Sequence, residues 1–396
     1  MPPTDGFRNI DELALAHQRV LVRVDFDVPL NDDGSVADDS KLCAALPTIR
    51  KVTSEGGRAV LVTHLGAAGE PPVSLEPVAM RLAELLGQEV YLPDEVLGDA
   101  ARKVVSDLRE GQVCLLENLR FVPEEAQNDD VLARKLLGLG DVYVGEAFGC
   151  AHLTHASTVA LPRIFKERGV GYRFKAELEA LERVAASAHK PYLGVLGGRS
   201  LSEQLPVLEV MLRRCGAICV GGAVASTLLA AKSIDMKSSL LEREQLALAR
   251  GILSRARDQR VELILPVDVV VARNADEADG SPVSVGSIPD QHGAFDIGPR
   301  TLETFRTRLA AAKTVLWHGT LGIVENPAFA QGSSELLAAL REAPAFGLVT
   351  GGKMARLARA GGAEQESKIG FVSTGGVASL VFIEGKRLPG IDALRG

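Results

Sequence analysis

The sequence predicts an α/β protein with two doubly wound lobes, each built on a parallel sheet. A single hydrophobic core seldom grows beyond roughly 250–300 residues, and this chain has 396. Short runs rich in Val, Ile and Leu alternate with amphipathic stretches, as in βα units that feed a parallel sheet. Residues 173–191 interrupt this alternation, with apolar residues at helical spacing and a closing proline, and predict a connecting helix.

The predicted strands form two series, one before and one after this helix. The first series is RVLVRVDF (19–26), RAVLVTHLG (58–66), VCLLENLRF (113–121) and DVYVGEAFG (141–149). The second series is YLGVLGG (192–198), AICVGGA (217–223), ELILPVDVVVA (262–272), KTVLWHGTLG (313–322) and FGLVTGG (346–352). We therefore expect an N-terminal lobe over 1–172, a connecting helix over 173–189 and a C-terminal lobe from residue 190.

Composition and charge argue against several classes of protein. A net charge of −7 does not suit broad nucleic-acid binding, which depends on Lys and Arg that neutralise phosphates. No apolar run approaches the ~20 residues that span a bilayer, and the N-terminus lacks the basic-then-apolar order of a secretory signal. The five cysteines show no CxxC pair, so neither a disulfide framework nor a metal site is expected. These features predict a cytoplasmic protein.

Four strands of the second series end in glycine-rich turns. The turns contain Gly197-Gly198, Gly221-Gly222, Gly319 with Gly322, and Gly351-Gly352. Ligands of doubly wound sheets bind beyond the carboxyl ends of the strands, where glycine lets the backbone approach a phosphate. The alternative is that each pair only forms a tight turn between a strand and a helix. Recurrence at four strand ends favours a phosphate-binding function.

The first series ends in a different set of side chains. They are Arg23, Asp25, His64, Arg120, His152 and His155. Guanidinium groups pair with phosphate and carboxylate in a bidentate way, so this set suits a small phosphorylated acid. Each residue alone could equally be a surface or capping group, but their shared position at strand ends favours a binding function.

Residues 348–354, LVTGGKM, place a lysine at a turn typical of phosphate binding. A magnesium-dependent site needs a carboxylate nearby, because the metal takes oxygen ligands. A cation at a helix N-terminus is unfavourable by about 0.3–1 kcal/mol unless an anion offsets it. Two interpretations follow: Lys353 contacts a bound anion without magnesium, or it is an exposed lysine in an unused pocket.

Nine ordered segments resemble the phosphoglycerate kinase family. They are VLVRVDFDVPL, ALPTIRKV, VTHLG, LLENLRF, EAFGCAHLTHAST, LPVDVVVA, DIGPRT, VSTGGVASL and EGKRLPGIDAL. The resemblance implies two Rossmann-like lobes that face a cleft, with 3-phosphoglycerate on the N-terminal lobe and Mg-nucleotide on the C-terminal lobe. It also implies that residues 380–396 return to the N-terminal lobe, so that the C-terminal lobe covers 190–379. The implied reaction is phosphoryl transfer between ATP and 3-phosphoglycerate, in glycolysis.

The resemblance also assigns roles to individual residues. The implied substrate-binding residues are Arg23, Asp25, Asp27, His64, Arg120 and His152. The implied nucleotide-binding residues are Gly197, Gly198, Arg199, Gly221, Gly222, Glu325, Gly351, Gly352 and Lys353, with Glu325 as the ribose-binding acid. Lys41 replaces the family arginine that stabilises the transferring phosphoryl group, so Lys41 and Arg120 are the expected catalytic residues.

The chain departs from the family pattern where the chemistry takes place. The departures are Asp27 for asparagine, Lys41, Ala67 and Leu153 for arginine, Ser200 and Gln204 for lysine, His318 for asparagine, Thr320 for proline, Thr350 for glycine, Lys353 for aspartate and Met354 for threonine. Arg199 restores part of the charge lost at the two lysine positions. The exchange of aspartate for Lys353 argues against Mg²⁺ binding.

These departures predict a homologue with strongly reduced or lost kinase activity. An arginine that stabilises phosphoryl transfer is worth about 10³–10⁵ in rate. We expect a pseudoenzyme that binds ATP or ADP, 3-phosphoglycerate, or an unknown protein partner, with no nucleic-acid or membrane partner. The alternative is an active phosphoglycerate kinase, or a related small-acid kinase, that uses Lys41, Arg199 and Lys353 as substitutes. A dinucleotide-dependent oxidoreductase is disfavoured, because no GxGxxG follows the first strand.

Overall fold

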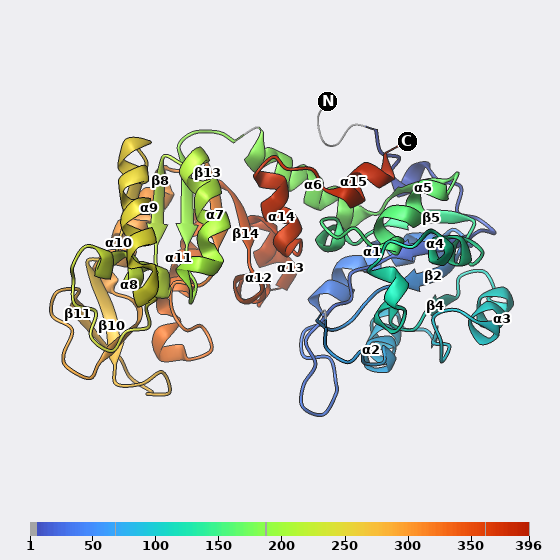
Figure 1. The fold of residues 1–396 in the computed structure, drawn as a ribbon, viewed down its shortest axis with the longest axis horizontal. Coiled ribbons are helices and arrows are strands. Elements are labelled where there is room, and N and C mark those ends of the chain that lie inside the picture. The colour runs from blue at the N-terminus through green and yellow to red at the C-terminus, as the bar shows by residue number, and fades with distance from the viewer. Residues whose placement is uncertain (1–5, 68, 187, 361, 396) are drawn as a thin grey trace. The chain divides into compact units, whose positions relative to one another are not determined.

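The computed structural model describes residues 6–67, 69–186, 188–360 and 362–395. The chain divides into two compact units (Figure 1): unit 1 combines Met1–Glu179 with Val377–Gly396, and unit 2 is Ala180–Gly376. The helix predicted over 173–189 is α6 (Tyr172–Ala185), and residue 187 of that prediction lies outside the described residues. None of the described helices is both long and apolar enough to cross a membrane.

Unit 1 contains a six-stranded parallel sheet with the order β3-β4-β2-β1-β5-β6. Its strands are β1 (Arg19–Arg23), β2 (Arg58–Val62), β3 (Val90–Tyr91), β4 (Val113–Leu115), β5 (Val142–Gly145) and β6 (Arg168–Val170). Its helices are α1 (Ser40–Ser54), α2 (Glu76–Leu86), α3 (Asp99–Asp107), α4 (Asp130–Leu137), α5 (Leu161–Ile164) and α15 (Pro389–Leu394), with α14 (Gly376–Ile383) at its boundary. Because β1 lies between β2 and β5, residues that follow these three strands meet at one edge of the sheet.

Unit 2 contains a second six-stranded parallel sheet, with the order β15-β14-β13-β7-β8-β9. Its strands are β7 (Tyr192–Leu196), β8 (Ala217–Val220), β9 (Glu262–Ile264), β13 (Thr314–His318), β14 (Phe346–Thr350) and β15 (Gly370–Val372). Its helices are α7 (Leu201–Arg214), α8 (Gly222–Ala231), α9 (Leu246–Asp258), α10 (Pro299–Ala311), α11 (Gln331–Glu342), α12 (Gly352–Arg359) and α13 (Gly362–Ser367). The prediction of two α/β parts with parallel sheets is confirmed.

Unit 2 also contains an antiparallel sheet that the sequence pattern did not predict. Its order is β11-β10-β12, from β10 (Asp268–Ala272), β11 (Ser281–Ser284) and β12 (Gly293–Ile297). The apolar run 262–272 is therefore two strands, since β9 belongs to the parallel sheet and β10 to the antiparallel one. Pro266 lies between them, and proline cannot donate a hydrogen bond to a strand ladder.

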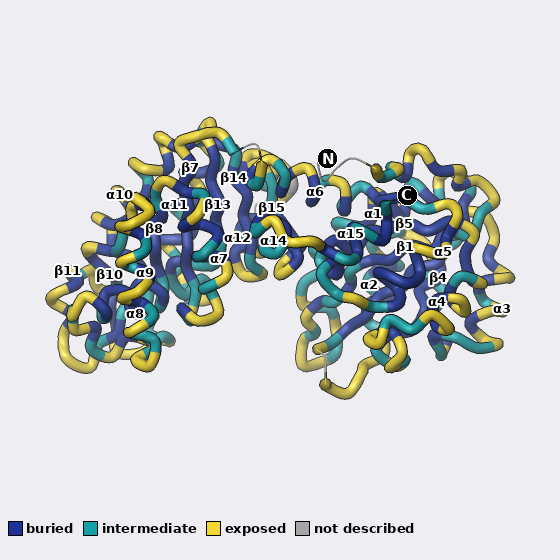
Figure 2. Tube along the Cα trace, turned by 45° about the horizontal axis from the view of Figure 1, so that its top comes forward, coloured by how far each residue is buried: buried dark blue, intermediate teal, exposed yellow. Residues whose placement is uncertain are grey.

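Both parallel sheets are buried on both faces (Figure 2). In β2, for example, Ala59, Val60, Leu61 and Val62 are each 0% exposed, although their side chains alternate between the two faces. Helices that cover both faces give parallel strands their near-continuous apolar sequences. This burial explains why the central strands could be predicted from short apolar runs.

One buried carboxylate joins the antiparallel sheet of unit 2 to a helix. Asp268, at the start of β10, is 4% exposed. Its Oδ1 accepts a hydrogen bond from the backbone N–H of Thr301 (2.8 Å), and its Oδ2 accepts one from the N–H of Arg300 (3.0 Å). These N–H groups lie in the first turn of α10, where no intrahelical acceptor exists. Asp268 therefore caps α10 from a neighbouring strand.

Replacing Asp268 with alanine is expected to lower the free energy of unfolding by about 1–3 kcal/mol, because the buried N–H of Thr301 and the partly buried N–H of Arg300 lose their acceptor. Urea unfolding followed by the fluorescence of Trp317, which is fully buried in unit 2, measures this change. The matched control is Asp276→Ala, an exposed acid of the same unit, with an expected change within about 0.5 kcal/mol. Equal losses in the two variants would contradict the capping role.

Candidate functional site

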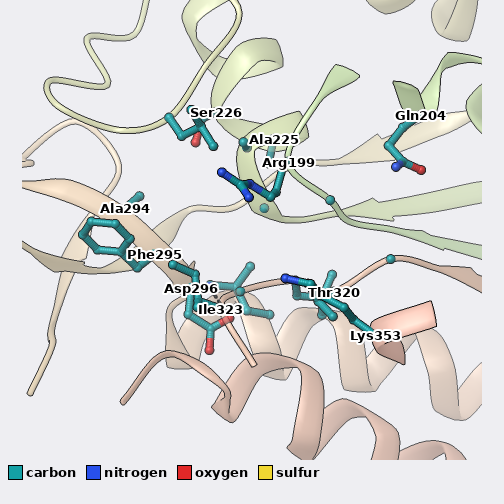
Figure 3. Close-up of a pocket in the computed structure, with 18 of the residues that line it drawn as sticks. Arg199, Gln204, Ala225, Ser226, Ala294, Phe295, Asp296, Thr320, Ile323 and Lys353 are labelled. Carbon is teal, nitrogen blue, oxygen red and sulfur yellow. Dashed lines mark hydrogen bonds between the residues drawn. The ribbon is translucent and has the colours of Figure 1, made fainter. Parts of the chain in front are cut away.

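A cavity of about 710 Å³ lies in unit 2, beyond the carboxyl ends of β7, β8, β13 and β14 (Figure 3). The predicted nucleotide-binding residues that line it are Gly198, Arg199, Gly222, Glu325, Gly351, Gly352 and Lys353. The departures from the family pattern that line it are Gln204, His318, Thr320, Lys353 and Met354. Gly197, Gly221 and Ser200 do not line this cavity and lie in the adjoining turns. The strand ends of the second series therefore meet around one space.

The glycine turns touch one another through their backbones. The N–H of Gly198 donates to the carbonyl of Thr320 (3.0 Å). A Cβ at Gly197 would lie only 2.0 Å from the same carbonyl oxygen. Gly222 has a φ of +63°, and a Cβ there would lie 2.6 Å from the carbonyl oxygen of Gly198. Backbone packing alone thus requires these glycines, as the tight-turn interpretation proposed.

Lys353 forms an ion pair with Glu325 across this cavity. Gly351, with a φ of +94°, turns the chain from β14 into α12, and Lys353 is the second residue of that helix. Its Nζ lies next to Oε1 of Glu325, and both side chains are about half exposed. The hydrogen bond from Lys353 lowers the pKa of the Glu325 carboxyl. The anion that offsets the cation at this turn therefore belongs to the chain itself.

Two other departures from the family pattern are direct partners. His318 ends β13 and Thr350 ends the neighbouring β14, and their register places them side by side. Nδ1 of His318 lies 2.6 Å from the Thr350 hydroxyl oxygen. Burial lowers the pKa of His318 to about 4, so the ring is neutral at pH values near 7. His318 therefore adds a hydrogen-bonding group, and no charge, to the floor of the cavity.

The N-terminus of α7 is occupied by a carboxylate of the chain. Ser200 is the N-cap, and its hydroxyl donates to Oε1 of Glu242 (2.9 Å) while accepting from the N–H of Glu203 (3.1 Å). Oε2 of Glu242 accepts from the N–H of Ser202 (3.1 Å). Burial opposes ionisation of Glu242, but hydrogen bonds from Ser202 and Ser200 outweigh it and lower its pKa. Ser200 therefore caps α7, at a position where the resemblance implies a charged lysine.

The opposite wall of the cavity is apolar and contains one buried acid. Phe295 and Ile323 line this wall, while Arg199 and Lys353 extend into the cavity from two other segments (Figure 3). Asp296 is 4% exposed, and its oxygens accept from the N–H groups of Gly332 (2.7 Å) and Ile297 (2.8 Å). Burial raises the pKa of Asp296 to about 7. This acid changes charge in the physiological pH range.

Unit 1 carries a second cluster, centred on Arg23 at the carboxyl end of β1. Arg23 is 1% exposed. Its Nη2 donates to Nδ1 of His64 (2.7 Å), its Nε donates to the Ser157 hydroxyl (2.8 Å), and its Nη1 donates to the carbonyl of Val24. The guanidinium therefore uses three of its five N–H groups to hold protein groups together.

The histidines of this cluster are held neutral. Burial and the charges of Arg23 and Arg120 lower the pKa of His64 to about 2. The same causes lower the pKa of His155 to about 4, and burial lowers that of His152. Within the described residues, Nε of Arg120 and Nδ1 of His155 are buried without a hydrogen-bond partner. Arg120 therefore keeps a donor without a protein partner in the described part of the chain.

The acids of the cluster are also engaged within unit 1. Nζ of Lys41, on α1, lies 2.9 Å from Oδ1 of Asp25. Burial opposes the charge of Lys41, but the carboxylate of Asp25 outweighs it and raises the pKa of Lys41. Oδ1 of Asp27 accepts from the N–H of Gly66 (3.0 Å). Lys41 is therefore charged but already neutralised by a neighbour.

Two departures in unit 1 put uncharged side chains where the resemblance implies arginine. Ala67 is exposed in the loop after β2, and Leu153 is half-buried after β5. His152, which precedes Leu153 in the sequence, has its Nδ1 2.9 Å from the carbonyl oxygen of Gly149. The cluster consequently contains Arg23, Asp25, Lys41, His64, Arg120 and His155, and it has fewer cations than the resemblance implies.

Sequence reasoning missed four polar residues of the two sites. They are Glu125, Ser157, Glu242 and Asp296. Asp296 carried a signal, because it is an acid inside the apolar segment AFDIG. Glu125, Ser157 and Glu242 carried none, since each acts on a partner 32 or more positions away in sequence.

The buried acid of unit 2 predicts a pH-dependent effect of mutation. The folded-state pKa of Asp296 is about 7, above the ordinary value of about 3.9. Its protonation therefore stabilises the fold fully below the unfolded pKa, and this stability is lost as the pH rises through 7. Asp296→Asn removes the titrating group and with it this pH dependence of stability. It also places the amide NH₂ of the asparagine, a donor, next to a backbone N–H that is also a donor.

We expect Asp296→Asn to cost about 2–4 kcal/mol more at about pH 4.5 than at about pH 8. Urea unfolding of unit 2, followed by Trp317 fluorescence, gives the two differences. Asp279→Asn, at an exposed acid of the same unit, is the matched control and should show no such contrast. A larger cost at the higher pH would show that Asp296 is ionised in the folded state.

The ion pair in the cavity predicts a change in the titration of its acid. Lys353→Met is expected to raise the pKa of Glu325 toward its ordinary value, because the hydrogen bond from Lys353 is the main cause of the lowered pKa. Carbon NMR of the Glu325 carboxyl measures the shift, with Lys353→Arg as the charge-conserving control. Stability should change by less than about 1 kcal/mol, since exposed pairs contribute little. An unaltered Glu325 titration would mean that the two side chains do not pair in solution.

Comparisons with known proteins agree over nearly the whole chain. The sequence profile of the family described as phosphoglycerate kinase matches residues 10–386. The phosphoglycerate kinase of Anaeromyxobacter dehalogenans strain 2CP-1 is 45% identical over 394 residues, which cover 98% of this chain and 99% of that protein. The one from Chlorobaculum tepidum is 41% identical over 395 residues, which cover 98% of this chain and 99% of that protein.

Solved structures give the same result. The structure of phosphoglycerate kinase from Coxiella burnetii has a TM-score of 0.83 and 32% identity, with 98% of each chain covered. That from Pyrococcus horikoshii has a TM-score of 0.83 and 30% identity, again with 98% of each chain covered. The full-length match in both sequence and fold shows that the chain belongs to the phosphoglycerate kinase family.

Proposed function

We propose that this chain is a phosphoglycerate kinase homologue with strongly reduced or lost kinase activity, whose unit 2 cavity binds a nucleotide or similar anion without Mg²⁺. The observation that carries the proposal is the ion pair between Lys353 and Glu325. In the family pattern, position 353 is an acid near the metal and nucleotide, and Glu325 is the ribose-binding acid. In this chain Lys353 puts an ammonium where the family pattern has a carboxylate, and Glu325 is the ion-pair partner of that ammonium.

The donor set of the cavity supports nucleotide binding better than metal binding. The apolar wall with Phe295 and Ile323 suits a base, and Arg199 and Lys353 suit a phosphate. Mg²⁺ prefers oxygen ligands, usually one or two carboxylates with substrate phosphates. The ammonium of Lys353 would repel a divalent cation placed beside it.

The polar cluster of unit 1 supports reduced turnover independently. Phosphoryl transfer depends on positioned charges that neutralise the transferring group. Arg23 directs its N–H groups to protein acceptors, and Lys41 is neutralised by Asp25. Ala67 and Leu153 add no charge. Arg120 keeps an Nε–H without a partner among the described residues, and each missing donor costs about 10²–10³ in rate.

A second candidate function is an active kinase that uses substitute residues. The observation that favours it is the charged state of Lys41, which the carboxylate of Asp25 maintains despite burial. Lys41 could then supply charge at the family's arginine position, although without the bidentate geometry of arginine. This candidate requires turnover that falls on Lys41→Ala and on Arg120→Ala.

Calorimetric titration with ATP, with and without Mg²⁺, tests the proposal, followed by coupled turnover with 3-phosphoglycerate on the same sample. We expect ATP affinity to be unchanged or weaker with Mg²⁺, because Lys353 repels the metal, and turnover at least about 10²–10³ below that of an ordinary kinase. Mg²⁺-dependent binding with turnover that both alanine variants abolish would establish the active kinase instead.

A restoring variant sharpens the test. Lys353→Asp combined with Gln204→Lys returns the family's acid and one of its lysines to the cavity. We expect ATP binding to become Mg²⁺-dependent in this variant. Lys353→Met combined with Gln204→Lys is the matched control, since it removes the ammonium without adding an acid. Equal Mg²⁺ dependence in the two variants would show that position 353 does not control metal binding.

A further inference from the structure

We propose that Glu125 and Ser157 are positioning residues that act through Arg23 to fix His64 as a neutral ring with its proton on Nε2. No contact with a ligand is needed for this role. The four side chains form one chain of hydrogen bonds through the interior of unit 1. The proposal rests on the proposed function in one respect, namely that the Nε2–H of His64 faces an anionic ligand.

The contact between Arg23 and His64 determines which ring nitrogen carries the proton. An arginine side chain is always protonated and has N–H donors but no acceptor. Nη2 of Arg23 lies 2.7 Å from Nδ1 of His64, so Nδ1 must be the acceptor. A neutral imidazole that accepts at one nitrogen carries its proton on the other. The ring therefore donates through Nε2.

Ser157 fixes the orientation of the guanidinium. Its hydroxyl oxygen accepts from Nε of Arg23 (2.8 Å) while its proton goes to Oε1 of Glu125 (2.5 Å). The backbone N–H of Ser157 donates to Oε2 of the same carboxylate (2.9 Å). Ser157 is 0% exposed and Glu125 is 3% exposed. Because the hydroxyl proton is directed at Glu125, the lone pairs of the oxygen face away from that carboxylate, and Nε of Arg23 donates to one of them.

The chain of contacts also sets the charge of the ring. Burial and the cations Arg23 and Arg120 lower the pKa of His64 to about 2, so the ring stays neutral. The ring of His155 lies edge-on to it, with 6.4 Å between centroids. A neutral ring with a fixed tautomer offers a hydrogen bond to an anion without proton exchange at physiological pH. Losing the tautomer would turn this donor into an acceptor that repels the anion.

The alternative is that Glu125 and Ser157 only hold the fold together. A purely structural role predicts lower stability on mutation but leaves the tautomer of His64 unchanged. A positioning role predicts a mixture of tautomers, because a guanidinium without its Nε partner can rotate away from Nδ1. The protonation state of the two ring nitrogens therefore separates the two roles, whatever the ligand or activity of the protein.

The test is long-range ¹H–¹⁵N NMR of the histidine side chains in the full-length, ligand-free protein. The wild type should show His64 with its proton on Nε2 throughout the neutral pH range. Ser157→Ala should show both tautomers and a higher His64 pKa. Thr158→Ala is the matched control, because its hydroxyl bonds to backbone groups of Leu153 and His155, whereas Arg23 bonds to Ser157, Val24 and His64. It should retain the wild-type spectrum of His64.

The wild type alone supplies a second measurement that does not depend on any variant being folded. The Nε–H of Arg23 should exchange slowly with solvent, since it is buried and bonded to Ser157. Three results would each overturn the proposal: rapid exchange of this proton, a proton on Nδ1 of His64, or an unchanged tautomer in folded Ser157→Ala.

Titration with 3-phosphoglycerate is a separate measurement. Ser157→Ala should weaken binding about tenfold. If neither protein binds, the result counts against the proposed function and not against the tautomer of His64.

Discussion

Close backbone contact between the glycine turns of unit 2 is the constraint on which the cavity depends. The turns after β7, β8 and β13 approach so closely that a Cβ at Gly197 would lie 2.0 Å from the carbonyl oxygen of Thr320. This contact fixes where β13 ends and where α8 begins, and so it positions the side chains around the cavity. The same glycines also leave space for a ligand to approach the backbone. Packing explains why these positions are glycine, so the chemistry of the ligand has to be inferred from the side chains beside them.

Internal charge pairing distinguishes those side chains from an open anion site. Lys353 pairs with Glu325, Lys41 pairs with Asp25, and Glu242 occupies the N-terminus of α7. A ligand phosphate would have to compete with carboxylates that already neutralise the cations. Such competition weakens the binding of anions generally.

The sequence was sufficient for the central strands and insufficient for the charge partners. Strands such as β2 are buried on both faces, so their apolar runs carry a strong signal, whereas β3 has two residues and leaves almost none. The apolar run 262–272 did not reveal that Pro266 separates strands of two sheets. Lys353 was recognised as unusual for its turn, but its partner lies 28 positions earlier on a different loop. Pairing of this kind depends on tertiary structure, which local patterns do not encode.

Ground-state binding and catalysis place different demands on this fold, and the substitutions separate them. A nucleotide can be held by apolar contact with a wall such as that of Phe295 and by a few donors. Rate acceleration requires groups that bind the transition state more tightly than the substrate, and in phosphoryl transfer those groups are charges in fixed positions. The buried cores and glycine turns, which determine the first property, match the family. Several charged positions, which determine the second, depart from the family pattern, so binding and catalysis can change independently of each other in this fold.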